Sequence, residues 1–272
     1  MSFNIYQKIC TAFFLILIVF WVILFTSGAR DGFYNYFFVF LYGLIPLFGG
    51  IAAMKGFYFW GKFMNAIGKA VFYIGLGLFL WGCGETVWAY YNFFTNVDIP
   101  YPSLADLFFA PSVFFYALGA IYLARTTADV ALKTAFGKVF VIFAPAILFG
   151  ISYYILIVVA RGGVLLSEGG LTLKTALDIL YPLGDFVALS VSVIVSGLSF
   201  KYLAGEYKAD IMLILSGLAT MFVADSIFSY TTTINTAYNG DLGDLVFTLA
   251  VFLLTCGVLG FNTLKNKPKV IS

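Results

Sequence analysis

The feature that most constrains this chain is a series of eight apolar runs, each as long as a membrane-spanning helix. About 20 apolar residues are needed for a helix to cross the hydrocarbon core of a bilayer. Of the 272 residues, 62% are hydrophobic and only 10% are charged, and no loop is long enough for a soluble domain. The sequence therefore predicts an all-α polytopic bundle, a single integral membrane domain over 1–272, with helices at about 9–28, 33–54, 71–93, 104–124, 139–160, 175–200, 211–233 and 243–263. An aromatic segment with spaced lysines at 55–70 is expected to lie along the lipid headgroups.

The basic residues divide unequally between the two sides of this bundle. If the N-terminus is cytoplasmic, 12 of the 15 Lys and Arg residues fall inside, and only Arg30, Arg161 and Lys174 fall outside. Loops rich in Lys and Arg stay in the cytoplasm. We therefore expect a multi-pass protein of the cell membrane with both termini cytoplasmic. This topology accounts for the net charge of +2, which gives no indication of nucleic acid binding.

Six acidic residues lie in or at the ends of these helices, all toward the predicted outer side. An ionisable group at membrane depth costs from about 2.5 kcal/mol upward, so such groups usually mark function. Glu85 and Asp225 lie within their helices and are the strongest candidates, with hydrogen bonding between helices as the structural alternative. Asp106 and Asp244 open their helices, where an Asp also caps free backbone N–H groups.

The other two acids, Asp178 and Asp185, lie seven residues apart in the sixth helix. A continuous helix would place them on one face. Pro182 lies between them, removes one backbone hydrogen bond and clashes with the carbonyl group four residues back. We therefore expect an irregularity at Tyr181–Pro182, which would leave Asp185 at the start of a half-helix.

The last six helices carry an internal repeat. A small residue, an Asp and a bulky apolar residue recur at Asp106, Asp185 and Asp244. Glu85 precedes the first of these by 21 residues, and Asp225 precedes the last by 19. This pattern predicts three hairpin repeats, formed by helices three and four, five and six, and seven and eight. Repeats often share a binding site at their interface, so we expect the acids to face one pocket.

Aromatic residues surround the predicted outer end of the third helix. Most such residues belong to the aromatic belt at the membrane surface, although an aromatic box beside carboxylates can also hold an organic cation. The candidate ligand-binding residues are Glu85, Asp185, Asp225, Trp81, Trp88, Asp106, Asp178, Tyr181, Tyr230 and Asp244.

The residue types argue against catalysis. The chain has no histidine, and its three cysteines are scattered through apolar runs without metal-binding spacing. Gly82-Cys83-Gly84-Glu85 is superficially similar to the Gly-x-Gly-Asp motif of intramembrane aspartyl proteases, but the acid is Glu and the partner Tyr-Asp motif is missing. We expect no enzyme activity and no cofactor; whether a metal binds is left open.

Four motifs together resemble a known membrane module. They are Trp81 to Tyr91, Pro100 to Asp106, Asp178 to Asp185, and Ala224 to Tyr230, within a match over roughly 70–263. The pattern is similar to the N-terminal multi-helix membrane module of bacterial and archaeal diguanylate cyclases and histidine kinases. The resemblance implies a sensor that drives a cytoplasmic output domain. No such domain follows in this chain, so we expect a stand-alone receptor, or a subunit whose partner is another chain.

The sequence therefore predicts a non-enzymatic, sensor-like or accessory module with an outward acidic and aromatic pocket for a cation or small ligand. The expected partners are the lipid bilayer and either other membrane subunits or a cytoplasmic signalling protein. One alternative is a structural subunit of a larger membrane complex. A second alternative is cation or proton transport, which would also require polar residues through the inner half of the helices.

Overall fold

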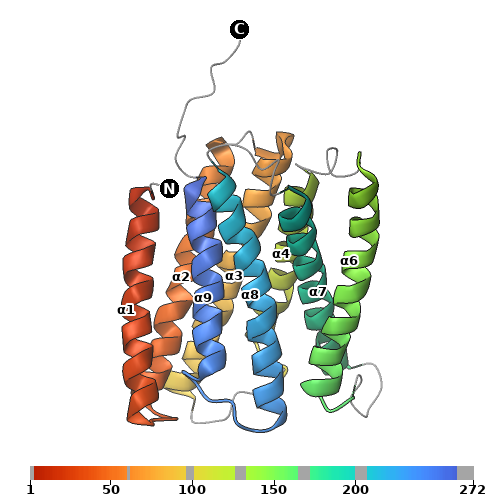
Figure 1. The fold of residues 1–272 in the computed structure, drawn as a ribbon. Coiled ribbons are helices and arrows are strands. Elements are labelled where there is room, and N and C mark those ends of the chain that lie inside the picture. Colours follow the sequence, from red (N-terminus) through yellow and green to blue (C-terminus); the bar gives the residue numbers. More distant parts are fainter. Residues whose placement is uncertain are drawn as a thin grey trace.

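The structure, a computed structural model, describes residues 3–59, 62–95, 101–125, 133–164, 172–199 and 207–261. These residues form helices and no strand, and eight of the helices are long and apolar enough to cross a membrane (Figure 1). The all-α, multi-pass prediction is confirmed at this level. The helices are α1 Ile5–Ser27, α2 Phe33–Phe59, α3 Ala66–Phe94, α4 Asp106–Arg125, α6 Ala135–Tyr153, α7 Leu173–Ser199, α8 Lys208–Thr233 and α9 Leu242–Gly260.

Several helices begin earlier than their apolar runs predict. α1 begins at Ile5 because the side chain of Asn4 accepts a hydrogen bond from the Gln7 backbone, and the Gln7 side chain accepts one from the Asn4 backbone. This reciprocal pair is a capping box, which starts a helix ahead of its hydrophobic stretch. The expected interfacial segment at 55–70 is also not a separate element. α2 continues to Phe59, a 3₁₀ turn covers Lys62–Met64, and α3 begins at Ala66.

Prolines lie inside four helices without ending them. The predicted start of a half-helix near Asp185 is wrong, because α7 is one continuous α-helix from Leu173 to Ser199. Proline removes a single hydrogen bond of the helix, and neighbouring helices in a membrane bundle can compensate for that loss. The irregular element lies instead at the end of α6, where Tyr154–Val159 form a π-helix. Such wide turns occur often at functional sites.

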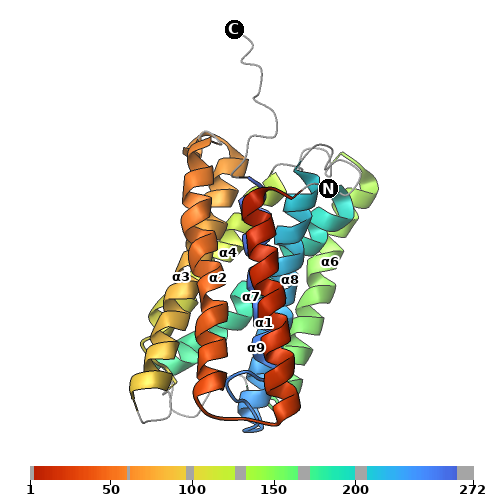
Figure 2. The same ribbon diagram turned by 90° about the vertical axis from the view of Figure 1, so that its left-hand side faces the viewer.

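The bundle has a packed centre and two exposed flanks. α2, α3, α8 and α9 form the middle, with α1 and α6 on opposite sides (Figures 1 and 2). α1 packs on α2 and α9, whereas α6 packs mainly on α7. The consecutive pairs α3–α4, α6–α7 and α8–α9 each pack together, although this does not test their descent from one repeat. Buried aliphatic side chains fill the centre, among them Ile74, Leu78, Leu215, Leu218 and Leu254.

The start of α1 and the end of α9 lie at the same end of the bundle. The Asn4 side chain donates a 2.9 Å hydrogen bond to the Leu259 carbonyl oxygen. Below it, the fully buried Gln7 donates to Asp210 Oδ1 at 2.8 Å and to the Cys256 carbonyl at 3.0 Å. These bonds fasten α1 to α8 and α9. Which side of the membrane this end faces stays a prediction.

Glycines on α3 let its neighbours approach closely near Glu85. A Cβ atom at Gly82 would lie 2.7 Å from the backbone nitrogen of Leu47 on α2, and one at Gly84 would lie 2.5 Å from the Phe109 ring on α4. Real Cβ atoms do not approach so closely. The small residues therefore bring α2 and α4 against the segment of α3 that carries Glu85.

Candidate functional site

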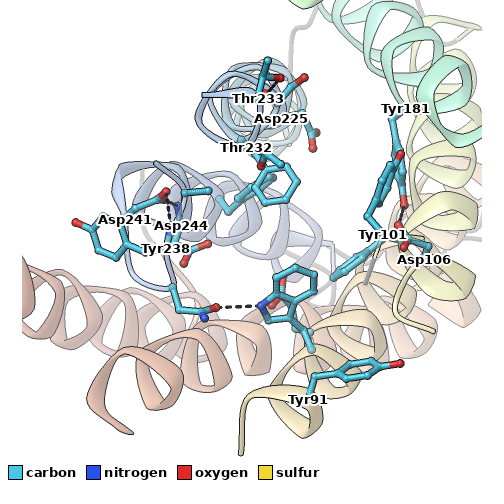
Figure 3. A pocket seen from close by; sticks show the side chains of 18 of the residues that line it. Tyr91, Tyr101, Asp106, Tyr181, Asp225, Thr232, Thr233, Tyr238, Asp241 and Asp244 are labelled. Carbon is cyan, nitrogen blue, oxygen red and sulfur yellow. Dashed lines mark hydrogen bonds between the residues drawn. The ribbon is translucent and has the colours of Figure 1, made fainter. Parts of the chain in front are cut away.

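A cavity of about 1080 Å³ opens at the end of the bundle opposite the start of α1. Residues of α2, α3, α4, α7, α8 and α9 line it, together with the π-helical turn after α6. Figure 3 shows Asp106 and Tyr181 on one wall, facing Asp225 and Asp244 across the space. Seven acidic residues take part, namely Asp31, Glu85, Asp106, Asp185, Asp225, Asp241 and Asp244.

Glu85 and Asp244 are joined through a tyrosine. The hydroxyl of Tyr42 on α2 donates a 2.9 Å hydrogen bond to Glu85 Oε1 and lies 3.5 Å from Asp244 Oδ1. Glu85 is only 4% exposed, nine residues before the end of α3, which corresponds to a depth of roughly 13 Å along the helix. The carboxylates of α3 and α9 therefore meet at a phenol from α2.

Asp185 and Asp225 form a second pair, between α7 and α8. Their carboxyl groups lie in hydrogen-bonding contact, and Asp185 is 5% exposed. The Oδ2 atom of Asp225 is buried, and no donor among the described residues reaches it. Two carboxyl groups share such a contact only when a proton or another cation relieves their repulsion. This pair is the part of the cavity best suited to a positive group.

Asp106 has two roles, one structural and one across the cavity. Its Oδ2 accepts a 2.7 Å hydrogen bond from the Ser103 backbone N–H in the turn before α4. Its Oδ1 accepts a 2.7 Å hydrogen bond from the Tyr181 hydroxyl on α7. The Asp106 carboxylate therefore fixes the turn that precedes its helix and also ties α4 to α7.

Asp244 lies in the first turn of α9, but another residue caps that helix. Asp241 is the N-cap, and its side chain accepts a hydrogen bond from the Asp244 backbone. Asp244 Oδ2 instead accepts from the Gly240 backbone at 2.5 Å. Burial raises the pKa of Asp241, although hydrogen bonds from the backbone of its own turn oppose the shift. The turn before α9 therefore holds two carboxylates next to the cavity.

The two tryptophans occupy different levels. Trp88 donates from Nε1 to Asn239 Oδ1 at 3.0 Å, which joins α3 to the turn before α9. Trp81 is 5% exposed and packs against the rings of Phe109 and Phe247. Its indole lies beside Glu85, yet its nitrogen meets the geometry of a hydrogen bond with no described residue. A buried donor without a partner is uncommon in folded proteins and calls for an occupant of the cavity.

The hydroxyl of Tyr116 on α4 is a third buried polar atom with no hydrogen-bond partner among the described residues. It interacts electrostatically with both Asp225 and Glu85. The Tyr116 hydroxyl therefore lies close to both carboxyl pairs, that of Glu85 with Asp244 and that of Asp185 with Asp225.

Eight of the ten residues predicted from the sequence line this cavity: Trp81, Glu85, Trp88, Asp106, Tyr181, Asp185, Asp225 and Asp244. Tyr230 is 43% exposed and is not among the described lining residues. Asp178 belongs to α7, but its side chain lies outside the described part of the structure.

The sequence analysis did not single out Tyr42, Asn239 or Asp241 as site residues. The signal for Asp241 was present, since Asp followed by a helix start is a capping pattern. Tyr42 carries no such signal, because one tyrosine among 18 is distinguished only by its partners.

Basic residues also line the cavity, which the sequence analysis did not expect. Arg30, Arg161 and Lys174 are at its mouth, in the α1–α2 turn, after the π-helix and in the first turn of α7. The Arg30 guanidinium lies 5.7 Å from the centre of the Tyr238 ring, and Lys174 Nζ lies 5.9 Å from that of Tyr101. Arg161 Nε donates to Ser229 Oγ at 3.5 Å. The site is thus acidic within and basic around its opening.

Among the described residues, no group of three or more His, Cys, Asp or Glu side chains is arranged to hold a metal ion. The acids of the cavity are distributed as pairs on different helices rather than as one compact ligand set. This arrangement fits several separate polar contacts with an organic ligand better than one metal centre.

No protein-family model matches this chain, and neither a curated protein nor a solved structure matches it. The resemblance to sensor modules of signalling enzymes therefore stays a prediction. The class that the structure itself defines is an all-helical protein whose described part contains eight helices able to span a membrane.

Proposed function

We propose that this protein is a non-enzymatic, sensor-like or accessory module of the cell membrane that binds a small cationic ligand in the acidic cavity. The observation that carries the proposal is the convergence of acids from five helices on one cavity: Glu85, Asp106, Asp185, Asp225 and Asp244. Because ionisable groups are costly at membrane depth, five in one place favour a functional role. The distribution of Lys and Arg supports placing this end outside the cell.

The interior below the cavity favours binding over transport. The fully buried side chains there include Ile74, Leu78, Leu215, Leu218 and Leu254, which offer no polar group to a passing ion. A transport path needs water or polar side chains through the whole membrane. These apolar side chains favour a vestibule in which a ligand binds and is detected by the helices that hold it.

Thermal unfolding in detergent tests this proposal, because a ligand that prefers the folded state must stabilise it. The panel contains alkylamines, quaternary ammonium ions and metal chlorides, each compared with sodium chloride at equal ionic strength. We expect at least one member to raise Tm in a saturable manner. Glu85→Gln combined with Asp225→Asn should abolish the rise, whereas Asp31→Asn, which removes one charge at the exposed mouth of the same cavity, should reduce it less.

The alternative outcomes are distinct. If no member raises Tm although the wild type is folded, the binding proposal is wrong, and a structural subunit becomes the better interpretation. If the rise survives in the double variant, the ligand binds elsewhere. Each single variant provides the same comparison should the double variant fail to fold.

A further inference from the structure

The charges of the cavity are arranged in two layers. The floor consists of Glu85, Asp185 and Asp225, which lie within helices α3, α7 and α8. The rim consists of Arg30, Arg161 and Lys174, which lie in turns or at a helix start. Glu85 and Asp185 are 4% and 5% exposed, whereas Arg30 and Lys174 are exposed. A ligand entering this cavity would therefore pass positive groups before it reaches negative ones.

Neither the helix dipole nor the membrane topology favours basic residues at the rim. In the described residues, the Lys and Arg at this end of the bundle are Arg30, Arg161 and Lys174, and all three line the cavity. Lys174 is the second residue of α7, where the helix dipole disfavours a cation. Basic residues are also disfavoured on the outer side of a membrane protein, the side to which we assign this end. Both the helix dipole at Lys174 and the expected topology therefore disfavour these basic residues, which suggests a functional reason for their position around one opening.

Among the described residues, no acid forms an ion pair with Arg30 or Lys174. Each of these cations lies over an aromatic ring, Tyr238 and Tyr101 respectively. In the described part of the chain, the exposed acid that lines the mouth is Asp31, which accepts a hydrogen bond from Tyr36. The rim therefore keeps positive charge available for an anionic group.

Two buried polar atoms near the floor, one on Asp225 and one on Trp81, lack hydrogen-bond partners among the described residues. Asp225 Oδ2 is a buried acceptor that no described donor reaches. Trp81 is 5% exposed, lines the cavity and holds an indole N–H without a hydrogen-bond partner among the described residues. A simple cation would satisfy only the first of these atoms. A ligand that carries both donors and acceptors, alone or with a bound water, would satisfy both.

We infer that the ligand is a zwitterion, with an ammonium group that binds the floor acids and an anionic carboxylate or phosphate group that binds a cation of the rim, Arg30 or Lys174. The aromatic wall of Trp81, Phe109, Phe228 and Phe247 would cover the short chain between the two ends. Two sources share this chemistry: a soluble amino acid or aminoalkyl phosphate, and the headgroup of an aminophospholipid. The inference rests on the proposed function and adds the second charge of the ligand.

The test compares ligands that differ by one anionic group. 4-Aminobutyrate, 6-aminohexanoate and phosphoethanolamine are titrated against n-butylamine, n-hexylamine and ethanolamine, with Tm in detergent as the readout. An exposed ion pair contributes up to about a fivefold gain in apparent affinity, so a zwitterion should bind up to about fivefold more tightly than its matched amine. In a separate arm, nanodiscs of phosphatidylethanolamine are compared with nanodiscs of phosphatidylglycerol to detect a bound headgroup.

Variants without the rim charges test whether the tighter binding of zwitterions depends on Arg30 and Lys174. Arg30→Gln with Lys174→Gln should remove the advantage of the zwitterion but leave the response to the amine. Lys55→Gln with Lys138→Gln, which removes two exposed charges at the other end, should change neither. A shift confined to phosphatidylethanolamine nanodiscs and lost in the rim variant identifies the headgroup as the source.

Failure of this inference differs from failure of the proposed function. If amines stabilise the protein as well as zwitterions do, or if the rim variant keeps the difference, the cavity binds a cation and the zwitterion inference is wrong. If neither class of compound nor either lipid changes Tm, the proposed function itself is overturned.

Discussion

The hydroxyl of Tyr42 on α2 donates a 2.9 Å hydrogen bond to the Glu85 carboxylate on α3, and both side chains are almost completely buried. Tyr42 also lies 3.5 Å from Asp244 on α9, so one phenol connects three helices around a buried acid of the cavity. The stability of the bundle and the geometry of the site therefore depend on the same contact.

Tyr42→Phe should lower the free energy of unfolding by about 1–3 kcal/mol, because it leaves a buried carboxylate without its donor while keeping the ring. Thermal or denaturant unfolding in detergent measures the change. Tyr90→Phe, at a tyrosine that is 58% exposed, is the matched control and should have almost no effect. Equal stability of the two variants would show that the Tyr42 hydroxyl does not support Glu85.

At the other end of the bundle, Gln7→Ala should destabilise the protein by about 2–4 kcal/mol. It removes the two hydrogen bonds that this fully buried side chain donates and the one that it accepts from the Asn4 backbone, and it takes a donor from the buried Asp210 carboxylate. Lys8→Ala, one residue away on the exposed face of α1, should be neutral. The Gln7 variant should respond to cavity ligands as the wild type does. Loss of that response would show that the hydrogen bonds of Gln7 and the cavity are not independent.

The eight helices and most of the site could be predicted from the sequence because both depend on patterns within single segments. Apolar runs locate the spans, and acids within such runs stand out individually. Glu85, Asp185 and Asp225 were found in this way, and the structure places them around one cavity.

What the sequence could not supply depends on contacts between segments. Tyr42 matters because α2 packs on α3, which no local pattern near Tyr42 indicates. Pro182 suggested a break, yet the neighbours of α7 support a continuous helix; the π-helix at Tyr154–Val159 has no comparable local signal. The basic rim was not predicted because Arg30 and Lys174, 144 positions apart in the chain, come to line the same cavity only in the folded bundle.

The space around two glycines, one on α3 and one on α6, predicts different effects on stability when each is replaced by alanine. Gly82→Ala should destabilise the protein by about 1–3 kcal/mol, because its Cβ atom would collide with the Leu47 backbone. Gly150→Ala, on α6, meets nothing within 4 Å and should be neutral or stabilising by up to about 1 kcal/mol. Unfolding midpoints of the two variants test the prediction, and the reverse order would show that α2 and α3 are not in close contact at Gly82.

Asp241 predicts a specific dependence of stability on pH. Its pKa is raised by burial, so the folded protein retains the proton to higher pH than the unfolded chain does. The contribution of Asp241 to folding stability is therefore fully present at pH values below its pKa in the unfolded chain. It is lost as the pH rises through its pKa in the folded protein. Asp241→Asn keeps an N-cap side chain and removes the titration, so Tm of the variant relative to wild type should increase from acidic to neutral pH. A constant difference in Tm across this range would contradict the raised pKa.

The orientation of the bundle can be tested with two conservative cysteine substitutions in a background lacking Cys10, Cys83 and Cys256. Ala237 is exposed in the turn before α9 at the cavity end, and Ala135 is exposed at the start of α6 at the other end. Because basic residues gather at the end that carries Ala135, we expect that end to be cytoplasmic. In intact cells, a membrane-impermeant thiol reagent should therefore label Ala237→Cys and leave Ala135→Cys unmodified, and both should react once the membrane is permeabilised. The opposite pattern would place the acidic cavity in the cytoplasm, where its ligand would have to be an intracellular compound.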